Sequence, residues 1–306
     1  MMNNLICLAG PTASGKTALA VQLARELDGE VVSCDSMQIY RRMDIGTAKP
    51  TPEEREGIVH HMLDVAEPEE DFSVSKYCQM ATPIVEDILA RGKTCILAGG
   101  TGLYMDSLIK GNDFAPFPST GVRESLEQEE TEVLLSRLQE IDSASAVRLR
   151  DRRRIIRALE VYLETGITMT EHNRRTQEIP PKFTPLWLAL DFENRQDLYD
   201  RINLRVDIML EQGLLEEIQS LLDSGIPETC TAMQAIGYKE FVAALQGRGN
   251  IAEAAQEVKK GSRHYAKRQL TWFRRNPAIH WLTRKADTSG EEILCAARQI
   301  VREFDN

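Results

Sequence analysis

The sequence lacks the long apolar runs that would place it in a membrane or on an export route. Nowhere among its 306 residues is there the run of about twenty apolar residues that a membrane-spanning helix needs. The first four residues carry no basic side chain, and the apolar stretch Leu5–Ala9 is far shorter than the core of a signal peptide. We therefore expect a cytoplasmic protein with no membrane partner, and take a monomer as the default state.

The sequence is also poor in positive charge and in paired cysteines. It has 37 Lys and Arg against 47 Asp and Glu, a net charge of -10, so any contact with nucleic acid must be local. Its six cysteines stand far apart, with no C-x-x-C pair and no histidine at zinc spacing, which argues against a disulfide framework or a zinc site. Cys7, Cys34 and Cys95 lie in apolar runs and are predicted to be buried core residues.

Short apolar runs that alternate with helical patterns predict an α/β fold. Such an alternation is typical of a parallel sheet flanked by helices, in which ligands bind at the carboxyl ends of the strands. Asp35 and Thr101 follow two of these runs. The predicted elements are, in order, a strand at Leu5–Ala9, a helix at 17–27, a strand at 31–34 and a strand at Thr94–Ala98.

Between residues 115 and 182 the composition changes, which predicts an inserted, all-helical domain. Pro116 and Pro118 open this segment, Pro180 and Pro181 close it, and the sequence between them is polar and helical. The core domain is then discontinuous and comprises residues 1–114 and 183–306.

Helix and strand signals continue through the insertion and beyond it. Gly166 is placed to end a helix over Arg152–Thr165, and a capping box at Thr168 and Glu171 starts the next helix. The later patterns predict a strand at 186–190, helices at 197–212, 233–245 and Ile251–Phe273, a strand at 279–282 and a final helix from about residue 289.

The most specific motif is G-x-x-x-x-G-K-T, which lies between the first strand and the first helix. Its glycines let the backbone curl so that N–H groups point inward, and the helix that follows adds the positive end of its dipole. Lys16 is expected to reach the terminal phosphate, and the Thr17 hydroxyl to hold Mg²⁺. The predicted diphosphate-binding loop consists of Gly10, Pro11, Thr12, Ala13, Ser14, Gly15, Lys16 and Thr17.

This ATP-binding-like motif indicates polyphosphate binding and not, by itself, ATP hydrolysis. An ordinary NTPase has an aspartate at the end of a buried strand that helps to hold the metal. Here the strand Thr94–Ala98 is followed by Gly99, Gly100 and Thr101, and no acid occupies that place. The loop therefore fits a leaving pyrophosphate instead of a nucleotide.

Asp35 is the candidate general base. A sheet of the predicted kind carries its carboxylate to the rim beside the phosphate loop. The pair Asp35-Ser36 is also typical of a helix cap or a turn. Two reactions suit a carboxylate that faces a bound polyphosphate: deprotonation of a hydroxyl for phosphoryl transfer, and deprotonation of an amine that attacks an allylic carbon. Asp35 alone does not choose between them.

These motifs and several longer blocks resemble tRNA dimethylallyltransferases, also called tRNA isopentenyltransferases, along nearly the whole chain. The blocks are GPTASGKT from Gly10, DSMQIY from Asp35, MDIGTAKP from Met43, HHMLDV from His60, GGTGLY from Gly99, RRIIRALEVY from Arg153, LYDRINLRVD from Leu198, QAIGYKE from Gln234 and KRQLTWFRR from Lys267. One departure is Asp151-Arg152, where Asp-Pro is expected, and it affects only local tRNA contacts. The absence of a zinc-finger extension points to the bacterial type.

The resemblance implies a P-loop NTPase-like core, a reaction and roles for residues. The dimethylallyl group would pass from dimethylallyl diphosphate to the exocyclic N6 amine of the adenosine 3′ of the anticodon, with Mg²⁺ as cofactor and the tRNA anticodon stem-loop as partner. Asp35 would be the base, Thr101 would bond near the reacting centre, and Arg205 would assist the departing pyrophosphate. Positions that match tRNA contacts are Asp35, Ser36, Met37, Gln38, Thr101, Arg123, Arg153, Arg154, Ile155, Ile156, Arg157, Gln234, Ala235, Ile236, Gly237, Tyr238 and Lys239.

Two basic runs oppose the acidic background. Residues 148–157 hold six arginines and one acid, and residues 259–275 hold seven Lys or Arg and no acid. Either run alone is typical of a solvated helix face. Together with the phosphate loop and the family resemblance, they favour contact with an RNA backbone. Tyr265 is a candidate for stacking on a base, whereas Trp272 and Phe273 are expected to pack in the core.

Three other functions share some of these features. A small-molecule or nucleoside kinase has the loop and the aspartate but needs ATP as donor and no arginine-rich insertion. An isopentenyltransferase acting on free adenine nucleotides would not need the helical insertion either. A nucleotide-switched RNA-binding protein without chemistry would not need Asp35 and Thr101 at the rim of the sheet.

Overall fold

The computed structural model describes residues 4–111, 120–149 and 151–304, and it divides into two compact units. Unit 1 comprises Met1–Gly111 and Lys182–Asn306, and unit 2 comprises Asn112–Pro181. The predicted opening of the insertion, with Pro116 and Pro118, lies outside the described residues.

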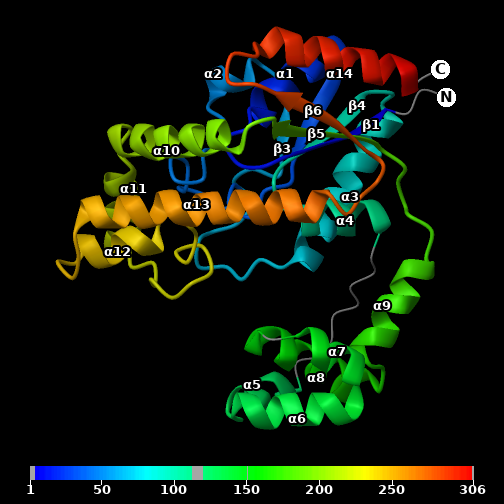
Figure 1. The fold of residues 1–306 in the computed structure, drawn as a ribbon, viewed down its shortest axis with the longest axis vertical. Coiled ribbons are helices and arrows are strands. Elements are labelled where there is room, and N and C mark those ends of the chain that lie inside the picture. The colour runs from blue at the N-terminus through cyan, green and yellow to red at the C-terminus, as the bar shows by residue number, and fades with distance from the viewer. Residues whose placement is uncertain (1–3, 112–119, 150, 305–306) are drawn as a thin grey trace. The chain divides into compact units, whose positions relative to one another are not determined.

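Unit 1 is built on a parallel sheet of six strands, as the predicted fold class requires. The strand order is β3-β2-β4-β1-β5-β6. In chain order the strands are β1 (Leu5–Ala9), β2 (Gly29–Ser33), β3 (His60–His61), β4 (Thr94–Ala98), β5 (Leu186–Phe192) and β6 (Ile279–Arg284) (Figure 1).

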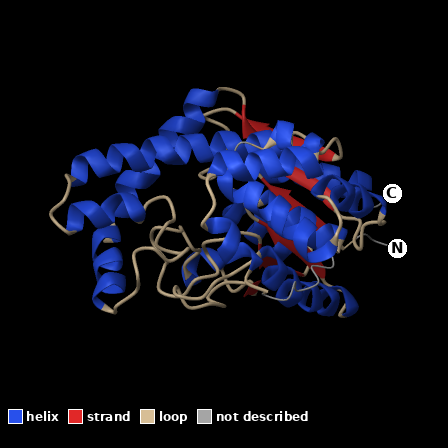
Figure 2. Ribbon diagram, turned by 90° about the horizontal axis from the view of Figure 1, so that it is seen from below, coloured by secondary structure: helices blue, strands red, loops and turns tan. Residues whose placement is uncertain are grey.

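Helices flank the sheet on both faces (Figure 2). On one face, Ile6 and Leu8 of β1 pack in a single core cluster with Leu19 and Leu23 of α1 and with Leu294 of α14. The predicted core cysteines are completely buried. The helices of unit 1 are α1 (Lys16–Glu26), α2 (Pro52–Arg55), α3 (Val74–Ala90), α4 (Gly102–Lys110), α10 (Arg195–Glu211), α11 (Leu214–Asp223), α12 (Lys239–Leu245), α13 (Ile251–Phe273) and α14 (Gly290–Phe304).

A second core in unit 1 joins helices α10 to α13 to the loop that follows β2. Tyr40 and Met43 from that loop are buried with Tyr238, Phe241 and Val258. In Figure 1, α10 and α13 run alongside each other beyond the sheet. This lobe therefore fixes the loop after β2 from the side opposite the sheet.

The helix predicted at 233–245 is shorter than expected, because α12 begins only at Lys239. Gly237 has a φ of 97°, a left-handed conformation that a right-handed helix cannot include. The residues before it form turns, and Met233 and Tyr238 are nevertheless buried. Tertiary burial of these side chains produced an apolar pattern that resembled a longer helix.

Unit 2 contains five helices among its described residues, and its apolar side chains form a core of their own. The predicted helix Arg152–Thr165 is α8, which Asp151 caps by accepting the N–H of Arg154 and which ends at Gly166, with φ 70°. Thr168 caps α9, as predicted. The helices are α5 (Val122–Glu127), α6 (Thr131–Ile141), α7 (Ser143–Arg148), α8 (Arg152–Thr165) and α9 (Met169–Glu178).

A buried carboxylate anchors the β3 edge of the sheet. Glu30 of β2 is 5% exposed and forms a two-pronged pair with Arg91, at 2.5 and 3.0 Å. His61 of β3 contacts the same carboxylate at 2.8 Å, so its side chain has a structural role at this edge. Hydrogen bonding from Arg91 lowers the pKa of Glu30 to about 2.

We expect Glu30→Gln to lower the free energy of unfolding by about 2 kcal/mol at pH 7, because the buried carboxylate loses its charge-assisted hydrogen bonds to Arg91. The folded-state pKa lies below the ordinary value of 4.5. The stabilisation is therefore present above that pH and is lost as the pH falls toward 2. Urea unfolding at several pH values measures this, with Glu69→Gln as the exposed control. Equal losses in both variants would contradict it.

Candidate active site

The carboxyl ends of three neighbouring strands meet at one edge of the sheet. Leu8 of β1 pairs with Ala98 of β4, and Ser33 of β2 pairs with Ala98 from the other side. The phosphate loop follows β1, Asp35 follows β2, and the turn Gly99–Thr101 follows β4. The register thus gathers all three predicted site segments at one place.

A cavity of about 620 Å³ opens at this edge, a size that suits a small-molecule ligand. The phosphate loop lines one end of it, and Asp35, Arg205 and Tyr265 line other parts of its wall. The loop at 44–49 and helix α10 complete the wall. The structure therefore brings the predicted anion cup, base and arginine to one cavity.

The phosphate loop has a backbone that only a special sequence adopts. Gly10, Ala13 and Gly15 all have positive φ, at 143°, 61° and 96°. Alternation of left- and right-handed residues turns successive N–H groups toward one side, which makes a site for an anion. Lys16 begins α1, and its Nζ donates to the carbonyl oxygen of Pro11 at 2.6 Å.

Positive charge concentrates around this loop. Burial lowers the pKa of Lys16 to about 7, with a further lowering from Arg205 and an opposing effect of Asp35. Burial also lowers the pKa of the Arg205 guanidinium. Both side chains are partly exposed to the cavity, and a bound anion would raise both pKa values.

Two further arginines contact backbone carbonyl groups of the loop, and the sequence patterns did not single them out. Arg201 Nε donates to the carbonyl oxygen of Ala13 at 3.1 Å. Arg284 donates to the carbonyl oxygen of Ser14 at 3.4 Å, and both guanidinium groups lie over the ring of Phe192. These contacts orient loop carbonyls outward. Arg284 belongs to β6, so only the completed sheet places it here.

Asp35 lines the cavity and also forms the turn that its sequence context predicted, while its role as a base stays a prediction. Its Oδ1 accepts the N–H of Met37 at 2.9 Å. The next residue, Ser36, donates its N–H to Thr101 Oγ1 at 3.0 Å. Gln38 donates to the carbonyl oxygens of Thr47 and Ala48. Thr101 therefore supports the Asp35 turn directly.

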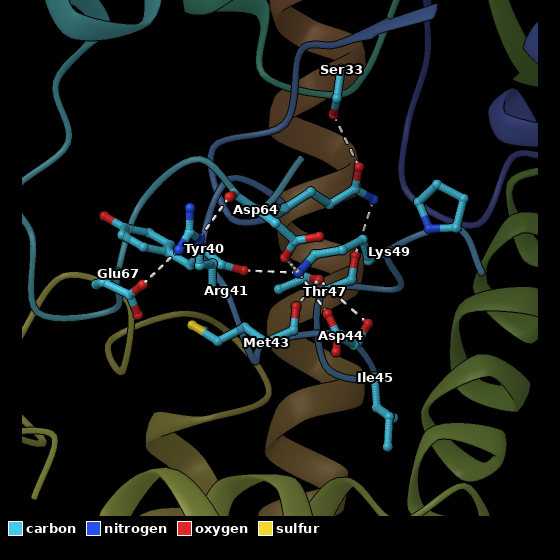
Figure 3. Close-up of polar contacts among 12 residues, drawn as sticks. Ser33, Tyr40, Arg41, Met43, Asp44, Ile45, Thr47, Lys49, Asp64 and Glu67 are labelled. Atoms are coloured by element: carbon cyan, nitrogen blue, oxygen red, sulfur yellow. Dashed lines mark hydrogen bonds and ion pairs between the residues drawn. The ribbon is translucent and has the colours of Figure 1, made fainter. Parts of the chain in front are cut away.

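The loop at 44–49 is held by two charged side chains. Glu217 of α11 accepts the N–H groups of Asp44 and Ile45, each at 2.7 Å, and of Gly46 at 3.1 Å. The buried Lys49 pairs with Asp44 and Asp64, each at 2.6 Å, as Figure 3 shows. In the same view, the side chain of Ile45 points away from this network. The cavity wall is thus a fixed surface.

The turn after β4 requires glycine because helix α13 packs directly on it. A Cβ on Gly100 would lie 2.0 Å from Gln269 Nε2, and one on Gly102 would lie 2.2 Å from the Trp272 ring. Trp272 Nε1 donates to Asp106 at 2.8 Å, and Phe273 is buried, so these aromatics pack in the core as expected. Tyr265 lines the cavity.

The predicted RNA contacts separate into exposed and buried residues. Arg123, Arg153, Arg154 and Arg157 are exposed in unit 2, and Gln234 and Lys239 are exposed in unit 1. Ser36, Met37, Gln38, Ala235 and Ile236 are partly exposed. The side chains of Ile155, Ile156 and Tyr238 are at most 3% exposed, and Gly237 is buried. The side chains of Ile155, Ile156 and Tyr238 pack in cores, so a contact of these residues with RNA would be made through backbone atoms and stays a prediction.

The basic runs are likewise only partly available to a ligand. Arg152 donates to the carbonyl oxygens of Glu127 and Glu129 and to the Thr131 hydroxyl, so it holds unit 2 together. Arg150 lies outside the described residues. In the second run, Lys259 pairs with Asp207.

The donor set near the loop suits a cation that is held largely by substrate. Among the described residues, no group of three or more His, Cys, Asp or Glu is arranged to hold a metal ion. The Thr17 hydroxyl and the carboxylates of Asp35 and Glu54 line the same cavity as the phosphate loop. Mg²⁺ characteristically takes one or two protein oxygens and completes its shell with phosphate and water.

The fold and the site together define a class: a P-loop α/β enzyme in which an anion cup and a carboxylate share one cavity. No helix among the described residues is long and apolar enough to cross a membrane. The family model described as IPP transferase matches residues 38–276. The chain belongs to this family of tRNA dimethylallyltransferases, as the sequence resemblance implied.

Individual relatives match over almost their whole length. A tRNA dimethylallyltransferase of Acetivibrio thermocellus is 42% identical over 310 residues, covering 99% of each chain. One from Caldanaerobacter subterraneus subsp. tengcongensis is 46% identical over 289 residues, covering 92% of each.

Solved structures agree with this relationship. The tRNA isopentenylpyrophosphate transferase of Bacillus halodurans is similar with a TM-score of 0.74 and 39% identity, covering 99% of this chain and 98% of that one. A eukaryotic dimethylallyltransferase acting on tRNA has a TM-score of 0.84 and 32% identity, covering 97% of this chain and 77% of that one.

We expect inorganic pyrophosphate to bind with uptake of a proton by Lys16 at pH 8 in the absence of metal. The free ammonium has a pKa of about 7, so it is mostly neutral at pH 8, and the bound anion raises that pKa. Calorimetry in two buffers of different ionisation enthalpy should show about one proton more for the wild type than for Lys16→Met. Below pH 6 the difference should vanish. Equal proton uptake by both proteins at pH 8 would refute this assignment.

Proposed function

We propose that this protein transfers the dimethylallyl group from dimethylallyl diphosphate to the exocyclic N6 amine of the adenosine 3′ of the anticodon in tRNA. One observation carries the proposal: the phosphate loop and Asp35 open into the same cavity. Family membership supports tRNA as the acceptor, because the relatives that match nearly full length are named for this reaction.

At the donor end, the leaving group is pyrophosphate. The backbone N–H groups of the loop, Lys16 and Arg205 would bind it and stabilise the negative charge that grows as the bond from C1 to oxygen breaks. Thr17, with Glu54, would hold a divalent cation, which when bound adds charge stabilisation at the diphosphate. Arg201 and Arg284 keep the loop in its binding conformation through Ala13 and Ser14.

At the acceptor end, the amine needs help because its lone pair is delocalised into the adenine ring. Asp35 would accept the proton as the new bond from N6 to C1 of the allyl group forms. The turn with Met37 and the bond from Ser36 to Thr101 hold this carboxylate in place. At the end of the step the proton is on Asp35, and the electron pair of the broken bond from C1 to oxygen is on pyrophosphate.

The acceptor base must leave its stack to enter the cavity, which favours a loop of RNA over a duplex. The exposed arginines Arg123, Arg153, Arg154 and Arg157 of unit 2 would contact the RNA backbone. In unit 1, Gln234 and Lys239 offer exposed polar groups. The exposed arginines of α8 favour tRNA over a free nucleotide, for which they would have no use.

The deciding assay supplies labelled dimethylallyl diphosphate and Mg²⁺ with tRNA, with AMP, or with ATP as an alternative donor. We expect the label on tRNA. Label on AMP would indicate an enzyme of free nucleotides, and consumption of ATP alone would indicate a kinase. Either result would replace the proposed function.

We expect Asp35→Asn to slow transfer to tRNA by at least about 100-fold, the usual effect of losing a general base. The asparagine keeps an acceptor for the N–H of Met37, so the turn should remain. Affinity for tRNA, measured by filter binding, should be largely unchanged. Asp223→Asn, at an exposed position of α11, is the control. A variant that retains most of its rate would remove Asp35 from the mechanism.

We expect Arg153→Glu or Arg157→Glu to weaken tRNA binding and to reduce its salt dependence. Each lost phosphate contact should lower the slope of log affinity against log salt by about 1. Arg195→Glu changes an exposed arginine of unit 1 and serves as the matched control. An unchanged slope in both test variants would contradict contact between these arginines and RNA.

A further inference from the structure

A single buried amide links the two halves of the candidate active site. Gln269 lies on α13, in the block KRQLTWFRR, and is 5% exposed. Its Oε1 accepts the N–H of Thr12 at 2.9 Å, and its Nε2 donates to the carbonyl oxygen of Gly100 at 3.0 Å. One side chain thus connects the phosphate loop with the turn after β4.

The link continues to the carboxylate. The N–H of Thr101 donates to the carbonyl oxygen of Cys34 at 3.1 Å, so the peptide between Gly100 and Thr101 is held on both sides. Thr101 Oγ1 then accepts the N–H of Ser36, the residue after Asp35. A continuous chain of hydrogen bonds therefore runs from the anion cup to the turn that bears the base.

The Gln269 amide packs directly against Gly100. A Cβ on Gly100 would lie 2.0 Å from Gln269 Nε2, so any larger residue there would displace the amide from its two partners. Tyr265, one helical turn earlier on α13, also forms side-chain hydrogen bonds with Thr101 and Gln269. The distance between helix and turn is set by packing, and the orientation of the turn is set by the amide.

The chemistry of the two partners selects glutamine. Thr12 offers an N–H and Gly100 offers a carbonyl oxygen, so the residue between them must accept at one end and donate at the other. A carboxylate at this place has no donor at neutral pH, and an ammonium has no acceptor. An apolar side chain of similar size fills the space but leaves both backbone groups without this partner.

We propose that Gln269 is a positioning residue that sets the geometry of the phosphate loop relative to the Asp35 turn through its bonds to Thr12 and Gly100. This inference rests on the proposed function, because the separation matters only if a leaving group at the loop and a base at Asp35 act in one step. Gln269 does not need to touch the substrate to do so. Reaction rate is sensitive to such placement, since a shift of about 1 Å in a reacting group costs about 100-fold.

The test compares Gln269→Met with wild type in three measurements on the full-length protein. The single-turnover rate of dimethylallyl transfer to tRNA at saturating donor should fall about 100-fold. The dissociation constants for inorganic pyrophosphate and for tRNA should each stay within about threefold, because Lys16, Arg205 and the outer surfaces are unchanged. Gln256→Met, an exposed glutamine on the same helix, should match wild type throughout.

A second pair of variants separates hydrogen bonding from packing. Gly100→Ala should lose rate because its methyl group displaces the Gln269 amide. Combining it with Gln269→Ala removes the clash and should restore the thermal midpoint while the transfer rate stays low. Recovery of the wild-type rate in the double variant would show that only packing matters, and would overturn the proposal.

Three other outcomes would overturn the positioning role, the proposed function or both. A Gln269→Met protein that keeps the wild-type rate, or one whose rate and pyrophosphate affinity fall together, overturns the positioning role while leaving the proposed function intact. A wild-type protein that binds pyrophosphate but transfers no label to tRNA overturns the proposed function, and the positioning role with it.

Discussion

The site depends on the positive charge that lies beside the phosphate loop. Burial lowers the pKa of both Lys16 and Arg205, and the Asp35 carboxylate opposes that lowering for both side chains. Buried cations are costly unless an anion accompanies them. Although the chain has a net charge of -10, most of its carboxylates lie away from this cavity. The charge of this cavity therefore favours an anionic ligand.

The phosphate loop stays free for a ligand only if the cavity wall is rigid, because a mobile wall could place one of its own carboxylates against the loop. The carboxylate of Glu217 is already occupied by three backbone N–H groups of the loop at 44–46 and by the Tyr238 hydroxyl. Lys49 likewise engages Asp44 and Asp64. These internal pairs hold nearby acids in fixed positions. Asp35 stays on the wall where a substrate can meet it.

Much of this architecture is visible in the sequence, and the limits have a physical cause. The bounds of β4, α8 and α13 match the periodic patterns because local burial and capping determine them. The phosphate loop is equally local. Gln269, Glu217 and Arg284 were not found because the site segments that they contact, at Gly100, Asp44 and Ser14, lie more than 160 residues away in the sequence and share no spacing with them. The two-residue strand β3 has no pattern long enough to detect, and the turns at 233–238 imitate a helix through tertiary burial.

Unit 2 carries exposed arginines although the protein as a whole is acidic. On unit 2, Glu160 is largely buried and contacts both Arg123, at 3.7 Å, and Arg157, at 2.8 Å. One acid thus orients two arginines without cancelling the charge of the neighbouring Arg153 and Arg154, which are exposed. Ordering these long side chains beforehand reduces the entropy lost when a phosphate binds. A small, preorganised patch on an acidic background favours selective contact with a matching arrangement of phosphates over indiscriminate attraction to any polyanion.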